Sequence, residues 1–222
     1  MDVQKESQAV LSELLSYQGP WRKYISDAPI PRPFRGSGDI RLVVLGQDPT
    51  VKNPEARRHI TTVLNLDKPG SLRSYLQRIC AGLGMRLDDH VYATNGIENF
   101  FTVPPTTVKE VDLLRLASRS WLVLLRREIA QFQDATLLSL GEPILPILAP
   151  CARTQKVRDY WGYTPSWKTG ERGAFRYVTA EESTRGRPIF PFPHQPSIRK
   201  IFYAERLDDY LVFVKAQVER AV

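Results

Sequence analysis

The sequence predicts an α/β domain built on a mainly parallel sheet. Short apolar runs that stop at turn-forming residues alternate along the chain with longer stretches in which apolar residues recur at helical spacing. At 222 residues the chain has the length of one large domain, and it is 42% hydrophobic and 25% charged, as globular proteins are. This composition excludes disordered, collagen-like and coiled-coil chains.

Four apolar runs are the predicted strands, and each stops close to a polar or turn-forming residue. They cover residues 41–45 before Gly46, 91–94 before Asn95, 135–140 before Gly141 and 188–192 shortly before His194. Because proline cannot donate a hydrogen bond to a sheet, the prolines in 188–192 predict an edge or irregular strand. We therefore expect a central four-stranded sheet.

Three stretches have the spacing of amphipathic helices. One begins at Ser71, a plausible N-cap, and ends before Gly84; a second runs from about residue 108 to 133, and a terminal one begins at about residue 201. We interpret their apolar stripes as core.

No internal repeat or low-complexity tract divides the chain. We expect a single domain over residues 1–222. Residues 1–38 form an N-terminal helix and a proline-rich lead-in, and residues 39–222 form the α/β core.

Targeting segments and cysteine clusters are missing from the sequence. No apolar run approaches the ~20 residues that span a bilayer, and the first residues lack the pattern of a signal peptide. We expect a soluble cytoplasmic protein, located at the nucleoid if the cell is bacterial, that does not bind a membrane. Cys80 and Cys151 stand alone, so we expect two reduced, buried thiols and no metal or other cofactor.

The charge is positive and concentrated in one region. The net charge is +7, and residues 151–200 hold ten basic side chains against four acidic ones, with six Tyr, Trp and Phe residues interleaved between positions 160 and 177. Cations mixed with flat rings suit a nucleic acid, because they bind phosphates and stack on bases. Basic surfaces are common, so a solvated basic face remains an alternative.

The ends of the predicted strands carry the polar residues on which chemistry depends. They supply Gln47 and Asp48, then Asn95, then His194. Ligands of open α/β sheets bind beyond the carboxyl ends of the strands, so one carboxylate, one amide and one imidazole are expected on the same rim. Such a set can activate water, read a polar heterocycle and stabilise a leaving anion. Taken singly, each residue is more often structural than functional.

Three motifs resemble, in order, those of the uracil-DNA glycosylase superfamily. Residues 42–49 (LVVLGQDP) resemble its water-activating motif, 68–72 (KPGSL) its Pro-Ser-Leu loop and 193–199 (PHQPSIR) its His-Pro-Ser loop, while Asn95 stands where the family's pyrimidine-reading Asn closes a strand. The resemblance implies a three-layer α/β/α fold and a metal-free, monofunctional DNA glycosylase. Such an enzyme flips a nucleotide out of double- or single-stranded DNA and leaves an abasic site.

The resemblance also implies a role for each matched residue. Asp48 serves the water and the oxocarbenium ion, His194 the departing base, and Asn95 the base edge, while Gln47 and Thr50 line the base site. His59 is a candidate to stack on the base. The residues expected to contact DNA are Lys68, Pro69, Ser71, Gln195, Ser197, Ile198, Arg199 and Lys200. Either Ile198 or Arg199 fills the gap left by the flipped base. One flipped nucleotide needs one site, so a monomer is expected.

Three departures from the family pattern concern the pocket. Thr50 stands where the uracil enzymes have a Tyr beside pyrimidine C5, the stacking aromatic residue is missing, and Gln195 separates His194 from Pro196. An opened pocket predicts a 5-substituted or modified pyrimidine as substrate. Candidates are hydroxymethyluracil, thymine-like lesions and the bulky hydroxymethylcytosine derivatives of phage DNA, whose excision would be antiviral defence.

Other functions stay open. A uracil-DNA glycosylase of base-excision repair is the nearest alternative, and a non-catalytic DNA-binding module on the same fold is an alternative of another class. A Rossmann-type nucleotide binder ranks last, because neither G-x-G-x-x-G nor a P-loop pattern occurs.

Overall fold

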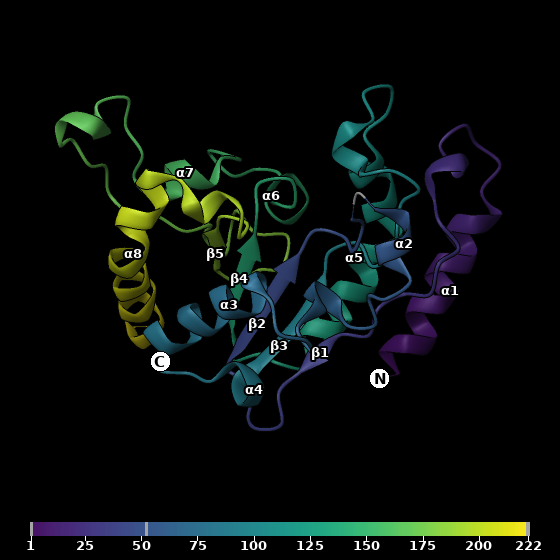
Figure 1. Cartoon of the computed structure of the whole chain (residues 1–222), viewed down its shortest axis with the longest axis horizontal. Coiled ribbons are helices and arrows are strands. Elements are labelled where there is room, and N and C mark those ends of the chain that lie inside the picture. Colours follow the sequence, from purple (N-terminus) through teal and green to yellow (C-terminus); the bar gives the residue numbers. More distant parts are fainter. Residues whose placement is uncertain (1, 52, 221–222) are drawn as a thin grey trace.

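A computed structural model of the chain shows a mixed α/β fold with helices on both faces of a central sheet (Figure 1). It describes residues 2–51 and 53–220. Within that part of the chain the sheet has five strands in the order β1-β3-β2-β4-β5. They are β1 (Phe34–Arg35), β2 (Leu42–Gly46), β3 (Val91–Asn95), β4 (Thr136–Leu140) and β5 (Ile189–Phe192).

The sheet is mostly parallel, as predicted. β2 pairs in parallel with β3 and β4, and β4 pairs in parallel with β5. All four predicted strands are present, and β5 lies at the edge of the sheet as its prolines indicated. The predicted total of four was wrong because β1 adds an antiparallel pairing of only two residues to β3, too short to leave an alternating pattern.

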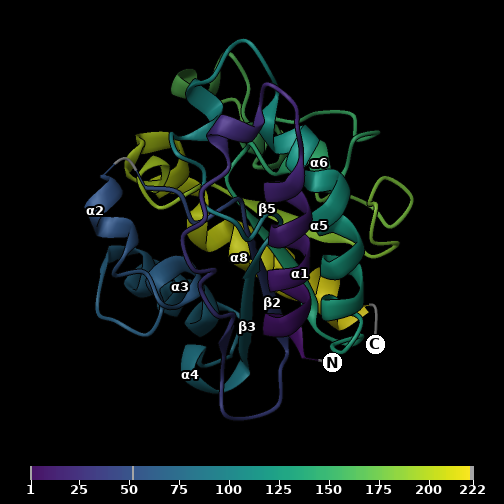
Figure 2. The ribbon, with the colours of Figure 1, turned by 90° about the vertical axis from the view of Figure 1, so that its right-hand side faces the viewer.

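Four long helices cover the sheet. The helices α1 (Val3–Ser16) and α5 (Leu113–Ile129) lie side by side on one face, as Figure 2 shows. On the other face α3 (Ser71–Gly82) packs against α8 (Ile201–Arg220). The remaining helices are short: α2 (Pro54–Arg57), α4 (Leu87–His90), α6 (Leu145–Leu148) and α7 (Val157–Tyr160). None of the helices in the described ranges is long and apolar enough to cross a membrane.

Two helix boundaries differ from the prediction. The helix expected over 108–133 is shorter, because the Asp112 carboxylate accepts a hydrogen bond from the backbone N–H of Arg115 and so caps α5 one residue before Leu113. Gly70, not Ser71, is the N-cap of α3, and Ser71 is the first residue inside the helix.

The two cysteines also differ from each other. Cys80, a residue of α3, is buried as expected, whereas Cys151 is exposed, which corrects the expectation that both thiols are buried. Cys151 follows the short helix α6 in a surface loop, where local apolar content says little about burial.

A pair of buried carboxyl groups ties the helix layer of α1 and α5 to the sheet. Glu98 and Glu128 are 3% and 0% exposed. Tyr92 donates a hydrogen bond of 2.6 Å to Glu128, and the Ser7 hydroxyl donates one to Glu98. Burial, with repulsion from Glu128, raises the pKa of Glu98 to about 8, and burial also raises the pKa of Glu128. The folded protein therefore keeps a proton on this pair at neutral pH.

The pair predicts a pH-dependent stability. Between pH 4.5, the ordinary carboxyl value, and about pH 8 the folded protein holds a proton that the unfolded chain has released, so the free energy of unfolding falls as the pH rises. Glu98→Gln is neutral at every pH and should flatten this slope, leaving the variant more stable than wild type at pH 8 by ~1 kcal/mol or more. Urea unfolding from pH 5 to pH 9 measures it, with exposed Glu219→Gln as the control for removing one charge. A slope unchanged in Glu98→Gln contradicts the prediction.

Candidate active site

The four parallel strands end at one edge of the sheet. Gly46 at the end of β2 is in register with Asn95 at the end of β3, and Leu140 of β4 is in register with Phe192 of β5. The arrowheads of β2 and β4 point to this edge in Figure 1. The loops that follow the strands therefore bring Gln47, Asp48 and His194 to the same rim as Asn95, as the strand pattern predicted.

Asp48 is half-buried in the loop that follows β2. The backbone N–H of Thr50 donates a hydrogen bond of 2.9 Å to its Oδ2, and the Gln47 side-chain amide donates to its Oδ1. Burial raises the pKa of Asp48, while the hydrogen bonds from Thr50 and Gln47 and the charge of Arg57 oppose the rise. A carboxylate has about four lone-pair positions, so Asp48 can still accept a proton from a water.

The Asp48 loop is held in place by Thr50 and Arg57. The Thr50 hydroxyl accepts a hydrogen bond of 2.7 Å from the backbone N–H of Phe101. The buried Arg57 guanidinium donates to the carbonyls of Phe101, Thr102 and Val51 at 2.8 to 3.0 Å. The sequence singled out Thr50 only as a pocket residue, and it left Arg57 unnoticed because a buried arginine has no sequence signature.

Asn95 is the most unusual residue of the rim. It is 1% exposed, yet neither its amide nitrogen nor its amide oxygen has a hydrogen-bond partner among the described residues. Its Oδ1 lies over Gly46. A Cβ added to Gly46 would be only 2.2 Å from this oxygen. An unpaired buried polar group costs about 1–3 kcal/mol, so it needs a reason to persist. A bound planar group with a matching acceptor and donor is such a reason.

Leu64 is a second neighbour of this amide that the sequence did not indicate. Its Cδ2 would lie 3.0 Å from a Cβ on Gly46. Its φ of 56° is in the left-handed region, which costs a non-glycine residue roughly 1–2 kcal/mol. By contrast His59, the predicted stacking residue, is exposed, and its carbonyl accepts a hydrogen bond from Lys68. Leu64 is thus the apolar side chain that lies against the end of β2.

His194 stands at the opposite side of the rim. Its Cβ lies close to Gly141: a Cβ added to Gly141 would be 3.7 Å from it. The backbone N–H of Gly141 donates a hydrogen bond of 2.8 Å to the carbonyl of Phe192 at the end of β5. Part of the His194 surface is exposed, but desolvation of the rest lowers the pKa of the imidazole. At neutral pH the ring is therefore neutral, with one N–H free to donate.

The predicted DNA-contacting residues lie in two groups. Lys68, Pro69 and Ser71 are exposed at the start of α3. The second group follows His194, whose carbonyl accepts a hydrogen bond of 2.8 Å from Ser197, in a turn that leads directly into α8. In this group Gln195, Ser197 and Ile198 are half-buried and Arg199 and Lys200 are exposed.

No protein-family model matches the chain, and no match is found among curated proteins. Within residues 2–51 and 53–220, no three His, Cys, Asp or Glu side chains are grouped so that they could hold a metal ion.

A conservative change at Asn95 distinguishes a binding residue from a structural one. Asn95→Leu keeps nearly the same shape and removes an unpaired buried amide, so we expect the free energy of unfolding to stay the same or to rise by about 1 kcal/mol. Urea denaturation measures it. A loss of more than about 2 kcal/mol would show that the amide is paired in the folded protein in solution.

Proposed function

We propose that the chain is a DNA glycosylase related to the uracil-DNA glycosylase superfamily, acting on a flipped pyrimidine with a substituent at C5. The observation that carries the proposal is the buried amide of Asn95, which has no partner among the described residues, on the same rim as the half-buried carboxylate of Asp48. An amide offers an acceptor and a donor side by side, which pairs with the N3 and C4 edge of a pyrimidine.

Asp48 and His194 act on different parts of the substrate, the sugar and the base. As the bond between C1′ and the base nitrogen breaks, positive charge grows on the sugar and negative charge on the base. The Asp48 carboxylate stabilises the sugar cation and accepts a proton from the water whose oxygen bonds to C1′. The neutral His194 imidazole donates a hydrogen bond from its N–H to the base anion and keeps its proton. The base anion later takes a proton from solvent. The products are a free base and an abasic site.

Thr50 supports the choice of a substituted base. Its hydroxyl is engaged by the Phe101 backbone and its side chain is short, so no phenol ring stands beside Asp48 at this position. A methyl or larger group at C5 then has room that a tyrosine would take. Hydroxymethylated pyrimidines and their bulky derivatives in phage DNA fit this description, with antiviral defence as the biological role.

An abasic-site assay tests the proposal. Duplexes and single strands carry uracil, thymine, 5-hydroxymethyluracil, 5-hydroxymethylcytosine or its glucosylated form. We expect cleavage of a 5-substituted base, and a loss of about 10²- to 10³-fold or more in rate for Asp48→Asn with DNA binding retained. Asp39→Asn, exposed before β2 at the other end of the sheet, is the matched control.

The same panel separates the alternatives. Preference for uracil would assign the chain to base-excision repair and would contradict the open pocket. Tight binding of DNA without any abasic sites would make the chain a binding module and would end the catalytic proposal.

The pH profile of excision gives an independent check. Asp48 acts as a carboxylate, so the single-turnover rate should fall about tenfold per unit as the pH drops below its pKa, which burial raises above the ordinary 3.8. The rate should remain level at neutral pH, where His194 is uncharged. An acid limb at or below pH 3.8, or the same limb in Asp48→Asn, would remove Asp48 from the proton transfer.

A further inference from the structure

A basic cleft lies next to the rim, between a projecting loop and the first turn of α8. It has a volume of about 660 Å³. The loop covers residues 161–177, after α7, and projects beyond the start of α8 in Figure 1. The basic and aromatic side chains on which the argument rests are six of its lining residues: Lys156, Arg158, Tyr163, Trp167, Arg199 and Lys200. We call this set the basic cleft.

The basic cleft is continuous with the candidate active site. Glu142, which also lines it, directly follows Gly141, and Gly141 lies beside the Cβ of His194. Arg199 and Lys200 end the same turn that His194 begins. A polymer strand with one residue at the rim would therefore place its next residues over the cleft.

The cations of the cleft are poorly neutralised by the protein. Among the described residues Lys156, Arg199 and Lys200 take part in no ion pair, and the pairing of Arg158 with Asp159 is long, at 3.8 Å. Glu142 is the acid in the lining. Cations gathered around one cleft repel one another, and phosphates along a strand would relieve that repulsion.

The rings of the cleft are held in fixed positions. Tyr163 and Trp167 have centroids 6.4 Å apart, and both meet Phe202 of α8 at steep angles, at 5.2 and 5.5 Å. The Arg158 guanidinium lies 4.9 Å from the Tyr163 centroid. Trp167 is half-buried and lines the cleft. Rings that are already ordered lose little entropy when a base stacks on them.

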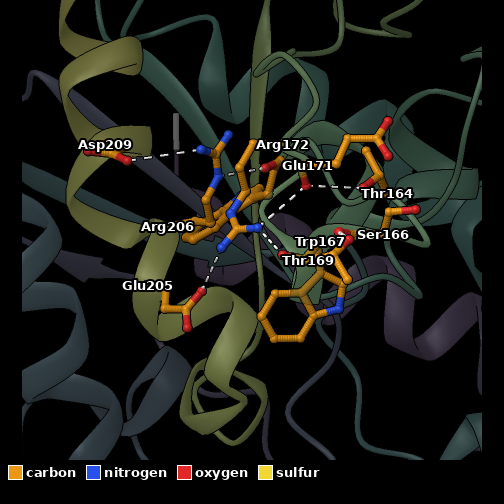
Figure 3. A network of polar contacts seen from close by, with 10 residues as sticks. Thr164, Ser166, Trp167, Thr169, Glu171, Arg172, Glu205, Arg206 and Asp209 are labelled. Atoms are coloured by element: carbon orange, nitrogen blue, oxygen red, sulfur yellow. Dashed lines mark hydrogen bonds and ion pairs between the residues drawn. The ribbon is translucent and has the colours of Figure 1, made fainter.

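The loop that carries Trp167 is anchored by α8, as Figure 3 shows. Arg172 pairs with Glu205 at 3.2 Å and donates to the carbonyl of Trp167. At the base of the loop, Arg206 donates to the carbonyl of Gly173 at 3.1 Å, and Gly173 donates to Gly162 at 2.9 Å. The loop is thus positioned before any ligand arrives.

We propose that the basic cleft binds the DNA strand next to the flipped nucleotide, with phosphodiesters on Lys156, Arg199 and Lys200 and an unstacked base on Trp167. The choice of DNA as the polymer rests on the proposed function. An acidic peptide would use the cations but would leave the rings without stacking partners. The cleft therefore favours an unpaired, single-stranded stretch beside the target.

The test uses a strand that cannot be a substrate. A 12-nucleotide oligodeoxyadenylate contains no pyrimidine, so its binding to the full chain is measured without excision, by fluorescence anisotropy at several salt concentrations. Lys156→Gln/Lys200→Gln should weaken binding and reduce the slope of log K against log salt by about 0.7 for each phosphate that is no longer neutralised. Lys5→Gln/Lys215→Gln removes two lysines that lie away from the cleft, on α1 and near the end of α8, and should change the slope much less.

Stacking is tested through Trp167. Trp167→Leu should weaken oligodeoxyadenylate binding roughly tenfold, whereas Trp167→Phe keeps a ring and should retain most of the affinity. Because Trp167 packs on Phe202, thermal unfolding of both variants confirms that they are folded. Quenching of tryptophan fluorescence by the oligonucleotide should disappear in Trp167→Phe.

The outcomes separate this inference from the proposed function. Wild-type affinity and salt slope in Lys156→Gln/Lys200→Gln would overturn the cleft proposal, even if the chain excises bases. A polyglutamate peptide that binds as tightly as the oligonucleotide and is unaffected by Trp167→Leu would also overturn it, in favour of an acidic protein partner. Cleft-dependent binding without any excision would uphold the cleft and reject the glycosylase.

Discussion

The register of β2 between β3 and β4 is the constraint on which the candidate site depends. β2 is buried along its whole length and pairs on both sides, so it cannot shift without exposing apolar side chains. Its last residue, Gly46, is opposite Asn95, and the missing side chain leaves the space that the Asn95 amide occupies. If β2 slipped by one residue, Leu45 or Gln47 would replace Gly46 opposite Asn95, and a side chain would fill the space that the amide occupies. The rim therefore takes its geometry from buried strands that are paired at the centre of the sheet.

Three groups that cost stability lie at this rim. The Asn95 side-chain amide has no hydrogen-bond partner among the described residues, Leu64 has a left-handed backbone, and burial opposes the charge on Asp48. Such unfavourable features persist where the surrounding structure compensates for them. Behind β5 the compensation is visible: Trp161 is fully buried, stacks on Tyr210 at 4.5 Å and donates a hydrogen bond of 2.8 Å to the Pro191 carbonyl.

The sequence predicted the parts of the fold that periodicity controls. The parallel strands, the edge position of β5 and the start of α8 follow from apolar runs and prolines. The gathering of Asp48, Asn95 and His194 on one rim followed from the rule that parallel strands end together. The two-residue β1, the exposure of Cys151 and the roles of Arg57 and Leu64 depend on contacts between distant segments, which leave no local pattern.

The close backbone contact between Gly162 and Gly173 separates the loop between them from the rest of the fold. The two backbones approach so closely that a Cβ on Gly162, where φ is 74°, would lie 2.1 Å from the Gly173 carbonyl oxygen. The two glycines thus meet at the base of the loop, and residues 163–172 between them belong to no strand of the sheet. We therefore expect the loop to accept insertions or deletions between the two glycines without disturbing the strands that form the rim.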